Sequence, residues 1–111
     1  MPDKDGYPTK RELYRVKNWN IIDKGAKALV EFIEEIWWYP ERQIEHHGNR
    51  LVLHTGGWSG NEDIIDALME QSDFWSIYWE KSIRGGHYYF NLRRKGLQRI
   101  WEGKKVKIKR R

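Results

Sequence analysis

The chain has 111 residues, enough for one ordinary domain with a single core and too few for a separate substrate domain. Hydrophobic residues make up 39% and aromatic residues 14%, including seven tryptophans, which argues against wholesale disorder and predicts a tryptophan-rich core. The absence of cysteine excludes disulfides, thiolate catalysis and cysteine-ligated zinc, and indicates a reducing compartment.

The net charge of +5 is unevenly distributed along the chain. Residues 93–111 contain ten Lys or Arg and one Glu, a net charge of +9, so residues 1–92 carry −4. The first six residues are charged and lack the apolar run of a secretory signal, and no apolar run is long enough to span a bilayer. These patterns predict a cytoplasmic protein without a membrane segment.

Residues 1–20 are expected to form an N-terminal arm. Two of the three prolines and Gly6 fall in its first ten residues, a composition typical of irregular structure. Leu13, Tyr14, Val16 and Trp19 then interrupt a basic segment, which fits a short edge strand or an ordered approach to the first helix. A single globular domain is expected over residues 21–102, and a basic tail or edge strand over residues 103–111.

The clearest helix is predicted near residues 23–38, where apolar residues recur three and four apart. Pro40 should end it, because proline lacks an N–H group and disfavours helical geometry in the preceding residue. Residues 41–49 are interpreted as a polar connection. Residues 50–54 contain the apolar run Leu51-Val52-Leu53 and predict a strand, one that could be buried on both faces.

A glycine-rich turn, Gly56 to Glu62, leads into the second predicted helix, near residues 60–71. Ser59 and Glu62 have the spacing of a capping box, in which each side chain bonds the backbone N–H of the other residue. Ser59 is therefore the preferred N-cap, with Asn61 as the rival. Apolar residues lie on one side of the helix that follows.

Two further strands are predicted, over residues 74–83 and near residues 87–93, joined by a two-residue turn at Gly85-Gly86. Counting outward from that turn places Ile83 opposite Tyr88 and Trp79 opposite Leu92 on an apolar face. The full order of elements predicts an α+β domain, with a small sheet that contains antiparallel strands and two helices packed on one of its faces.

Two surfaces are candidates for binding. The first is the glycine-rich turn, because the N–H groups at a helix N-terminus attract anions; its residues are Gly57, Trp58, Ser59, Asn61 and Glu62. This turn is neither a P-loop nor a dinucleotide fingerprint, and a tight turn with a capping box explains most of it. The second is the polar and aromatic face of the hairpin, with Arg84, His87, Tyr89 and Arg93.

The histidines give no signature of a metal site or a catalytic centre. His46, His47, His54 and His87 lack the spacing of metal ligands, so no metal, cofactor or catalytic residue is assigned. The enzymatic alternative pairs a carboxylate such as Glu62 or Glu80 with His54 or His87 as acid and base, although nothing in the sequence fixes their distances.

The basic C-terminal end is the strongest electrostatic feature. Beside Tyr78, Tyr89 and Trp101 it could neutralise phosphates and stack on bases. A solvated tail, or a contact with acidic helices of the same or another chain, explains it as well. The candidate residues for nucleic acid are Arg94, Lys95, Arg99, Lys104, Lys105 and Lys107.

The two glycine motifs are TGGWSGNE at residues 55–62 and RGGHY at residues 84–88, with Phe74, Trp75 and Trp79 between them. In this combination the chain resembles a group of small bacteriophage and prophage proteins of unassigned function. The resemblance spans about residues 51–92 and leaves out both ends of the chain. It implies a phage gene product in the cytoplasm of a bacterial host, and it implies no activity.

We therefore expect a phage-encoded, non-enzymatic accessory protein that binds a host or phage protein or nucleic acid. The basic C-terminal end is one route to nucleic acid. The alternatives are a small hydrolase-like enzyme that uses acid–base residues near the glycine-rich turn, and a structural component of the virion. No cofactor and no membrane contact are expected, and the sequence leaves the oligomeric state open.

Overall fold

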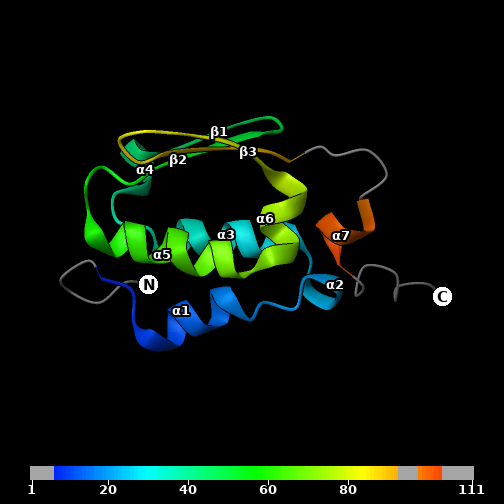
Figure 1. Ribbon diagram of the computed structural model, residues 1–111. Coiled ribbons are helices and arrows are strands. Elements are labelled where there is room, and N and C mark those ends of the chain that lie inside the picture. Colours follow the sequence, from blue (N-terminus) through cyan, green and yellow to red (C-terminus); the bar gives the residue numbers. More distant parts are fainter. Residues whose placement is uncertain (1–6, 93–97, 104–111) are drawn as a thin grey trace.

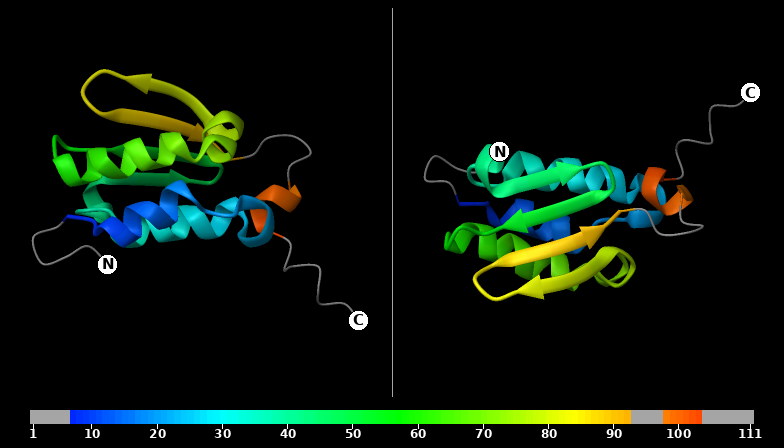
Figure 2. Two further views of the ribbon diagram at one scale, coloured as in Figure 1. Left: turned by 60° about the horizontal axis from the view of Figure 1, so that its bottom comes forward. Right: turned by 90° about the horizontal axis from the view of Figure 1, so that it is seen from above.

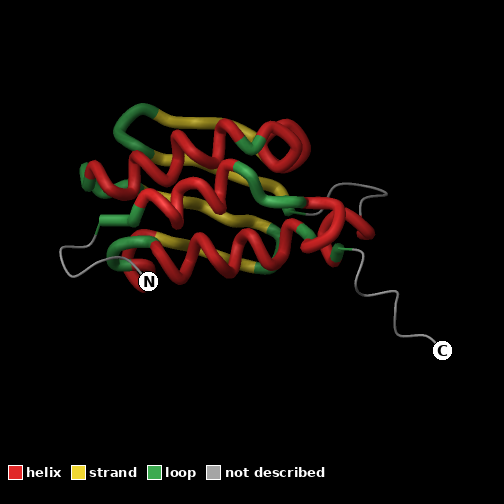
Figure 3. Tube along the Cα trace, turned by 90° about the horizontal axis from the view of Figure 1, so that it is seen from below, coloured by secondary structure: helices red, strands yellow, loops and turns green. Residues whose placement is uncertain are grey.

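A four-stranded antiparallel sheet covered by helices on one face makes up the fold. The computed structural model describes residues 7–92 and 98–103. Strands β1 (Ile44–His47), β2 (Arg50–His54), β4 (His87–Asn91) and β3 (Trp79–Ile83) lie in that order across the sheet. The helices lie beneath it (Figures 1 and 3), and the view from above shows strands with no described helix in front of them (Figure 2). The α+β class expected from the sequence is confirmed.

The two predicted helices form the centre of the helical layer. They are α3 (Ala26–Ile36) and α5 (Ser59–Glu70). Helix α3 ends before Trp37, whose backbone is extended, and Pro40 begins the short helix α4 (Pro40–Gln43) instead of only ending α3. The fully buried side chains of these helices and the sheet form one core: Leu29, Ile33, Ile36, Ile64, Ile65, Leu68, Leu51, Leu53 and Phe90.

The expected N-terminal arm contains a helix whose residues reach the core. Helix α1 (Lys10–Lys17) stands where an edge strand was considered, and the short helix α2 (Ile21–Lys24) follows it. A capping box starts α1, since the Glu12 N–H donates to Thr9 Oγ1 at 3.1 Å and the Thr9 N–H donates to Glu12 Oε1 at 2.9 Å. Val16 is fully buried, and α1 packs against α5.

The strand predicted over residues 74–83 is wrong in its first half. Residues Ser72–Tyr78 form helix α6, and β3 begins only at Trp79. The helix starts where the Phe74 N–H donates to the side chain of Gln71 at 2.9 Å. Phe74 and Tyr78, four residues apart, are both fully buried, so helical spacing places two large rings in the core.

The polar connection expected over residues 41–49 contains α4 and the edge strand β1. Strand β1 pairs with β2 through a tight turn at Gly48 and Asn49, with His47 opposite Arg50. No residue of β1 is fully buried. An exposed edge strand needs no alternation of apolar residues, and for this reason β1 could not be predicted from the pattern of apolar residues.

The predicted hairpin register is also wrong. Arg84, Gly85 and Gly86 form a three-residue turn, Ile83 lies opposite His87, and the pairing is irregular between Trp79 and Lys81. Every residue of β3 is exposed, so no buried face holds this strand to one register. The alternation of β4 is as predicted, with Phe90 and Leu92 buried.

Trp58, rather than Ser59 or Asn61, is the N-cap of α5. The Glu62 N–H donates to Trp58 O at 3.1 Å, and no side chain caps the helix. The predicted capping box is therefore absent, and Ser59 Oγ donates instead to Tyr7 Oη at 3.5 Å.

Helix α7 (Gln98–Glu102) packs against α2 and α3. Among the described helices, none has the length and apolarity required to cross a membrane.

Candidate functional site

The sheet face opposite the helices carries a patch of polar, charged and aromatic side chains. Leu51, Leu53 and Phe90 point into the core, so their alternating neighbours on β2 and β4 point the other way. Val52 is buried yet lies outside the core cluster, and this places it on that opposite face between Glu45 and Tyr89 of the flanking strands. We call this surface the open face; its members are Glu45, His47, Arg50, Val52, His54, Lys81, Ile83, His87, Tyr89 and Asn91.

Tyr89 lies near the middle of the open face, on the central strand β4. Its ring is partly exposed and is flanked by two cations: Arg50 Cζ lies 5.6 Å and Lys81 Nζ 4.8 Å from the ring centroid. Both cations stand on exposed positions of neighbouring strands. A partly exposed aromatic ring and two positive charges thus lie together on the sheet.

A hydrogen-bonded chain of three titratable side chains lies beside Tyr89. His54 Nδ1 is 2.8 Å from His87 Nδ1, and His54 Nε2 is 2.7 Å from Glu45 Oε2. His54 and His87 are direct cross-strand partners on β2 and β4, and Glu45 is the diagonal neighbour of His54 on β1. The His54 side chain is 19% exposed and that of Glu45 is 52% exposed.

The two glycine motifs meet at one end of the open face. The Thr55 N–H donates to Gly86 O at 2.9 Å, which extends the β2–β4 pairing by one residue beyond the histidines. A Cβ atom at Gly86 would overlap Thr55 Oγ1, so the close approach needs glycine there. Thr55 Oγ1 also donates to Glu62 Oε2 at 3.4 Å, which brings the start of α5 to the same place.

Asn61, one of the predicted binding residues, is fully buried and bonds the backbone. Its Oδ1 accepts from the Trp38 N–H at 2.9 Å, and its Nδ2 lies 3.3 Å from both Trp38 O and Thr55 O. The amide therefore joins the segment after α3 to the turn before α5. This is a structural role that needs no ligand.

Trp58 lies in a partly exposed aromatic stack above the glycine-rich turn. Its ring stacks on Tyr7 with a centroid distance of 5.0 Å and on Trp38 at 5.4 Å. A Cβ at Gly60 would meet Trp58 Nε1 at 2.9 Å, so this glycine makes room for the stack. Much of the glycine content of this turn thus serves local packing.

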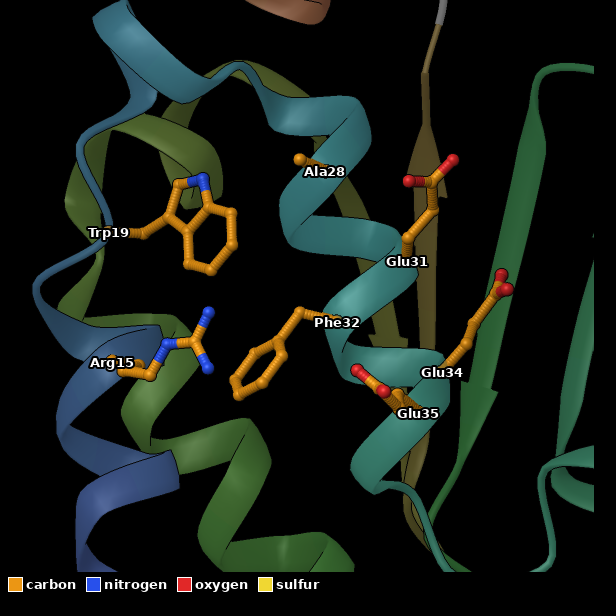
Figure 4. A pocket seen from close by; sticks show the side chains of 7 residues that line it. All are labelled: Arg15, Trp19, Ala28, Glu31, Phe32, Glu34 and Glu35. Atoms are coloured by element: carbon orange, nitrogen blue, oxygen red, sulfur yellow. The ribbon is translucent and has the colours of Figure 1, made fainter. Parts of the chain in front are cut away.

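An open hollow of about 580 Å³ lies on the helical side, between α1 and α3. Figure 4 shows the Arg15 guanidinium between the rings of Trp19 and Phe32. Its Cζ lies 4.2 Å from the Phe32 centroid. Three carboxylates of α3 line the rest of the hollow: Glu31, Glu34 and Glu35. Its aromatic floor is already covered by Arg15, and its acidic wall repels anionic ligands.

Among the predicted site residues, His87 and Tyr89 lie on the open face, and Glu62 lies near the His87 end of that face through its contact with Thr55. Gly57 is exposed in the turn before α5, and Ser59 is exposed at the first residue of α5. Arg84 is exposed in the hairpin turn, and Arg99 is exposed on α7. Their roles in binding stay predictions. The remaining predicted residues lie outside the described residues: Arg93, Arg94, Lys95, Lys104, Lys105 and Lys107.

Sequence reasoning did not place Glu45, Arg50 and Lys81 in the site. It considered Glu62 or Glu80 as the partner of a histidine, whereas the carboxylate that contacts His54 is Glu45. The strand order supplies this contact, and no local sequence signal carried it. Across residues 7–92 and 98–103, no group of three or more histidine, aspartate or glutamate residues is arranged to hold a metal ion.

No protein-family model matches the chain, and neither a curated protein nor a solved structure shows significant similarity to it. The geometry of the open face is therefore the basis for assigning a function.

Proposed function

We propose that this protein is a non-enzymatic module that binds single-stranded nucleic acid across its open face. Tyr89 carries the proposal, because its partly exposed ring lies between Arg50 and Lys81 on a face that no described helix covers. Aromatic rings with nearby cations bind single strands without strict sequence preference, since bases stack on the ring and cations neutralise phosphates.

The size and charge of the two faces support this choice. A strand of five residues is about 17 Å long, so the open face fits a few nucleotides and not a long duplex. The hollow on the opposite side is lined by three glutamates and disfavours a polyanion. The basic C-terminal residues, with net charge +9 over residues 93–111, would add phosphate contacts that do not depend on sequence.

The biological setting that we propose is that of an accessory protein encoded by a bacteriophage and acting in the cytoplasm of its host. The support for it is the resemblance of the two glycine motifs to those of small phage proteins. Short single strands are common intermediates of replication and transcription, and a small module with one binding face would suit a partner of that kind.

Fluorescence anisotropy with labelled single-stranded oligonucleotides tests the proposal on the full chain. Tyr89→Leu keeps an apolar cover over Val52 but removes the ring, and we expect it to weaken binding about 5- to 150-fold, because stacking of one base contributes about 1–3 kcal/mol. Tyr89→Phe should bind like the wild type, since stacking does not need the hydroxyl group. Tyr14→Leu is the matched control, because Tyr14 is 65% exposed on α1, away from the open face.

The salt dependence of binding tests the cations separately. Lys81→Gln should lower the slope of log K against log salt by about 0.7, the value for one neutralised phosphate of a single strand. Lys27→Gln, at an exposed position of α3, should leave the slope unchanged. The triple variant Lys104→Gln, Lys105→Gln and Lys107→Gln tests the C-terminal end in the same way. If this variant abolishes binding while Tyr89→Leu leaves it intact, the interface lies at the C-terminal end and not on the open face.

A second candidate function, acid–base catalysis, is favoured by the chain Glu45–His54–His87. A carboxylate that orients one histidine, which in turn orients another, is an arrangement that can activate a base. Incubation of the protein with labelled RNA and DNA single strands tests this candidate. Cleavage that His87→Gln abolishes while Tyr89→Leu only weakens it would favour an enzyme over a binding module.

A further inference from the structure

The hydrogen-bond partners in the chain Glu45–His54–His87 determine where its hydrogens lie. An ionised carboxylate can only accept, so His54 Nε2, at 2.7 Å from Glu45 Oε2, carries a hydrogen. The two Nδ1 atoms are 2.8 Å apart, so a single hydrogen lies between them. Three of the four ring nitrogens are thereby assigned, and His87 Nε2 is the nitrogen left to face a ligand.

A proton added at His87 Nε2 breaks no hydrogen bond. It turns this nitrogen from an acceptor into a donor and gives the histidine pair one positive charge, which Glu45 partly balances through His54. A further proton would place hydrogens on both Nδ1 atoms and break the contact between them. The hydrogen bonds of the pair are therefore compatible with one added proton and not with two.

Gly85 keeps the space next to His87 Nε2 free of a side chain. A Cβ atom at residue 85 would lie 3.2 Å from His87 Nε2, and Gly85 has φ +96°, a conformation that favours glycine. His87 itself is half-buried. The first glycine of the hairpin turn thus allows the backbone conformation of the turn and also keeps the space around this nitrogen open.

The charged groups around the pair come from several strands and from α5. Glu45 of β1 contacts His54, Ile83 of β3 is the apolar cross-strand partner of His87, and Glu62 of α5 bonds the neighbouring Thr55. Lys81 lies opposite Tyr89, one pair of positions along from His87 and about 7 Å from it in the backbone, whereas Arg50 lies opposite Asn91, about 13 Å away. A nucleotide stacked on Tyr89 would place a phosphate within reach of His87.

We propose that His87 Nε2 is a proton-linked binding site for an oxygen of a phosphate group, in which the anion binds together with one proton. The site deepens the proposed function and rests on it, because the phosphate it takes is that of a nucleotide held on Tyr89. A free inorganic phosphate offers the same oxygens and is the alternative source of the ligand. Arg50 and Lys81 neutralise neighbouring phosphates without a proton.

Oligonucleotide affinity as a function of pH tests the proposal on the full chain. Between about pH 5 and 8, where imidazoles titrate, wild-type affinity should rise towards low pH by up to tenfold per pH unit. His87→Gln should remove this dependence and keep the affinity measured at the alkaline end. His46→Gln is the matched control and should keep the full pH dependence, because His46 is an exposed histidine of β1 that lies outside the open face.

Two outcomes separate this site from the proposed function. Binding that is independent of pH, or a pH dependence that survives in His87→Gln, would overturn the site and leave nucleic-acid binding standing. A lack of oligonucleotide binding would overturn the proposed function, and the site would then be tested with inorganic phosphate. In ¹⁵N spectra at constant pH, phosphate should shift His87 Nε2 towards its protonated form in the wild type, and an unchanged nitrogen would refute the site.

Discussion

Replacement of Asn61 by alanine should destabilise the protein strongly, because its buried amide joins the segment after α3 to the turn before α5. Asn61→Ala removes the acceptor for the Trp38 N–H and the donors for Trp38 O and Thr55 O. Each hydrogen bond contributes about 0.5–1.5 kcal/mol, and a buried group left without a partner costs more. The expected loss is about 2–4 kcal/mol, against a total stability of about 5–15 kcal/mol for a domain.

Urea unfolding followed by tryptophan fluorescence measures this loss. The midpoint should fall by about 1–3 M at an unchanged slope. Asn61→Asp keeps the acceptor but places a negative charge against two carbonyl groups, so we expect it to be at least as unstable as Asn61→Ala. Ser59→Ala is the control and should change stability by less than about 0.5 kcal/mol, since Ser59 does not cap α5. The reasoning would be refuted if Asn61→Ala left the stability nearly unchanged while Ser59→Ala lowered it strongly. Such a result would indicate that the predicted capping box at Ser59 exists.

Two further predictions concern Tyr78 and Gly86. The Tyr78 hydroxyl is buried without a hydrogen-bond partner among the described residues, and burial raises the pKa of Tyr78 to about 12. Burial disfavours the phenolate in the folded state, so stability keeps its full value below about pH 10 and falls as the pH rises towards 12. Tyr78→Phe should raise stability by about 1 kcal/mol in urea unfolding at neutral pH and weaken the alkaline loss; a destabilised variant would show that the hydroxyl has a partner. Gly86→Ala should lower stability in thermal unfolding by at least about 1 kcal/mol more than Gly48→Ala. Both glycines have positive φ, at a cost of about 1–2 kcal/mol for alanine, but only the new Cβ at Gly86 meets another residue, Thr55; equal losses would contradict this contact.

The elements that could be predicted from the sequence are those whose buried apolar residues recur at a regular spacing. Helix α3 and strand β2 were predicted because their apolar residues face the core at helical or strand spacing. Helix α6 was mistaken for a strand because Trp75, Ile77 and Trp79 lie two residues apart, as on one side of a strand, while the pair Phe74 and Tyr78 fits a helix equally well. Strand β1 was missed because none of its residues is fully buried.

The site was predictable only in part, for a similar reason. The alternation of β4 placed His87 and Tyr89 on one face without knowledge of the other strands. Their partners could not be predicted, since Glu45 and His54 reach His87 only through the strand order β1-β2-β4-β3. A local pattern shows which way a side chain points, but not which distant strand lies beside it.

The contact between His54 and His87 also depends on the complete assembly of the sheet. Strands β1 and β2 form one hairpin and β3 and β4 another, and each can close through its own short turn. The two imidazoles, separated by 33 residues in the chain, come together only when the hairpins dock side by side. The NMR signals of the two rings would therefore report completion of the fold. A fragment that lacks either hairpin would lose both the histidine pair and the arrangement of side chains around Tyr89.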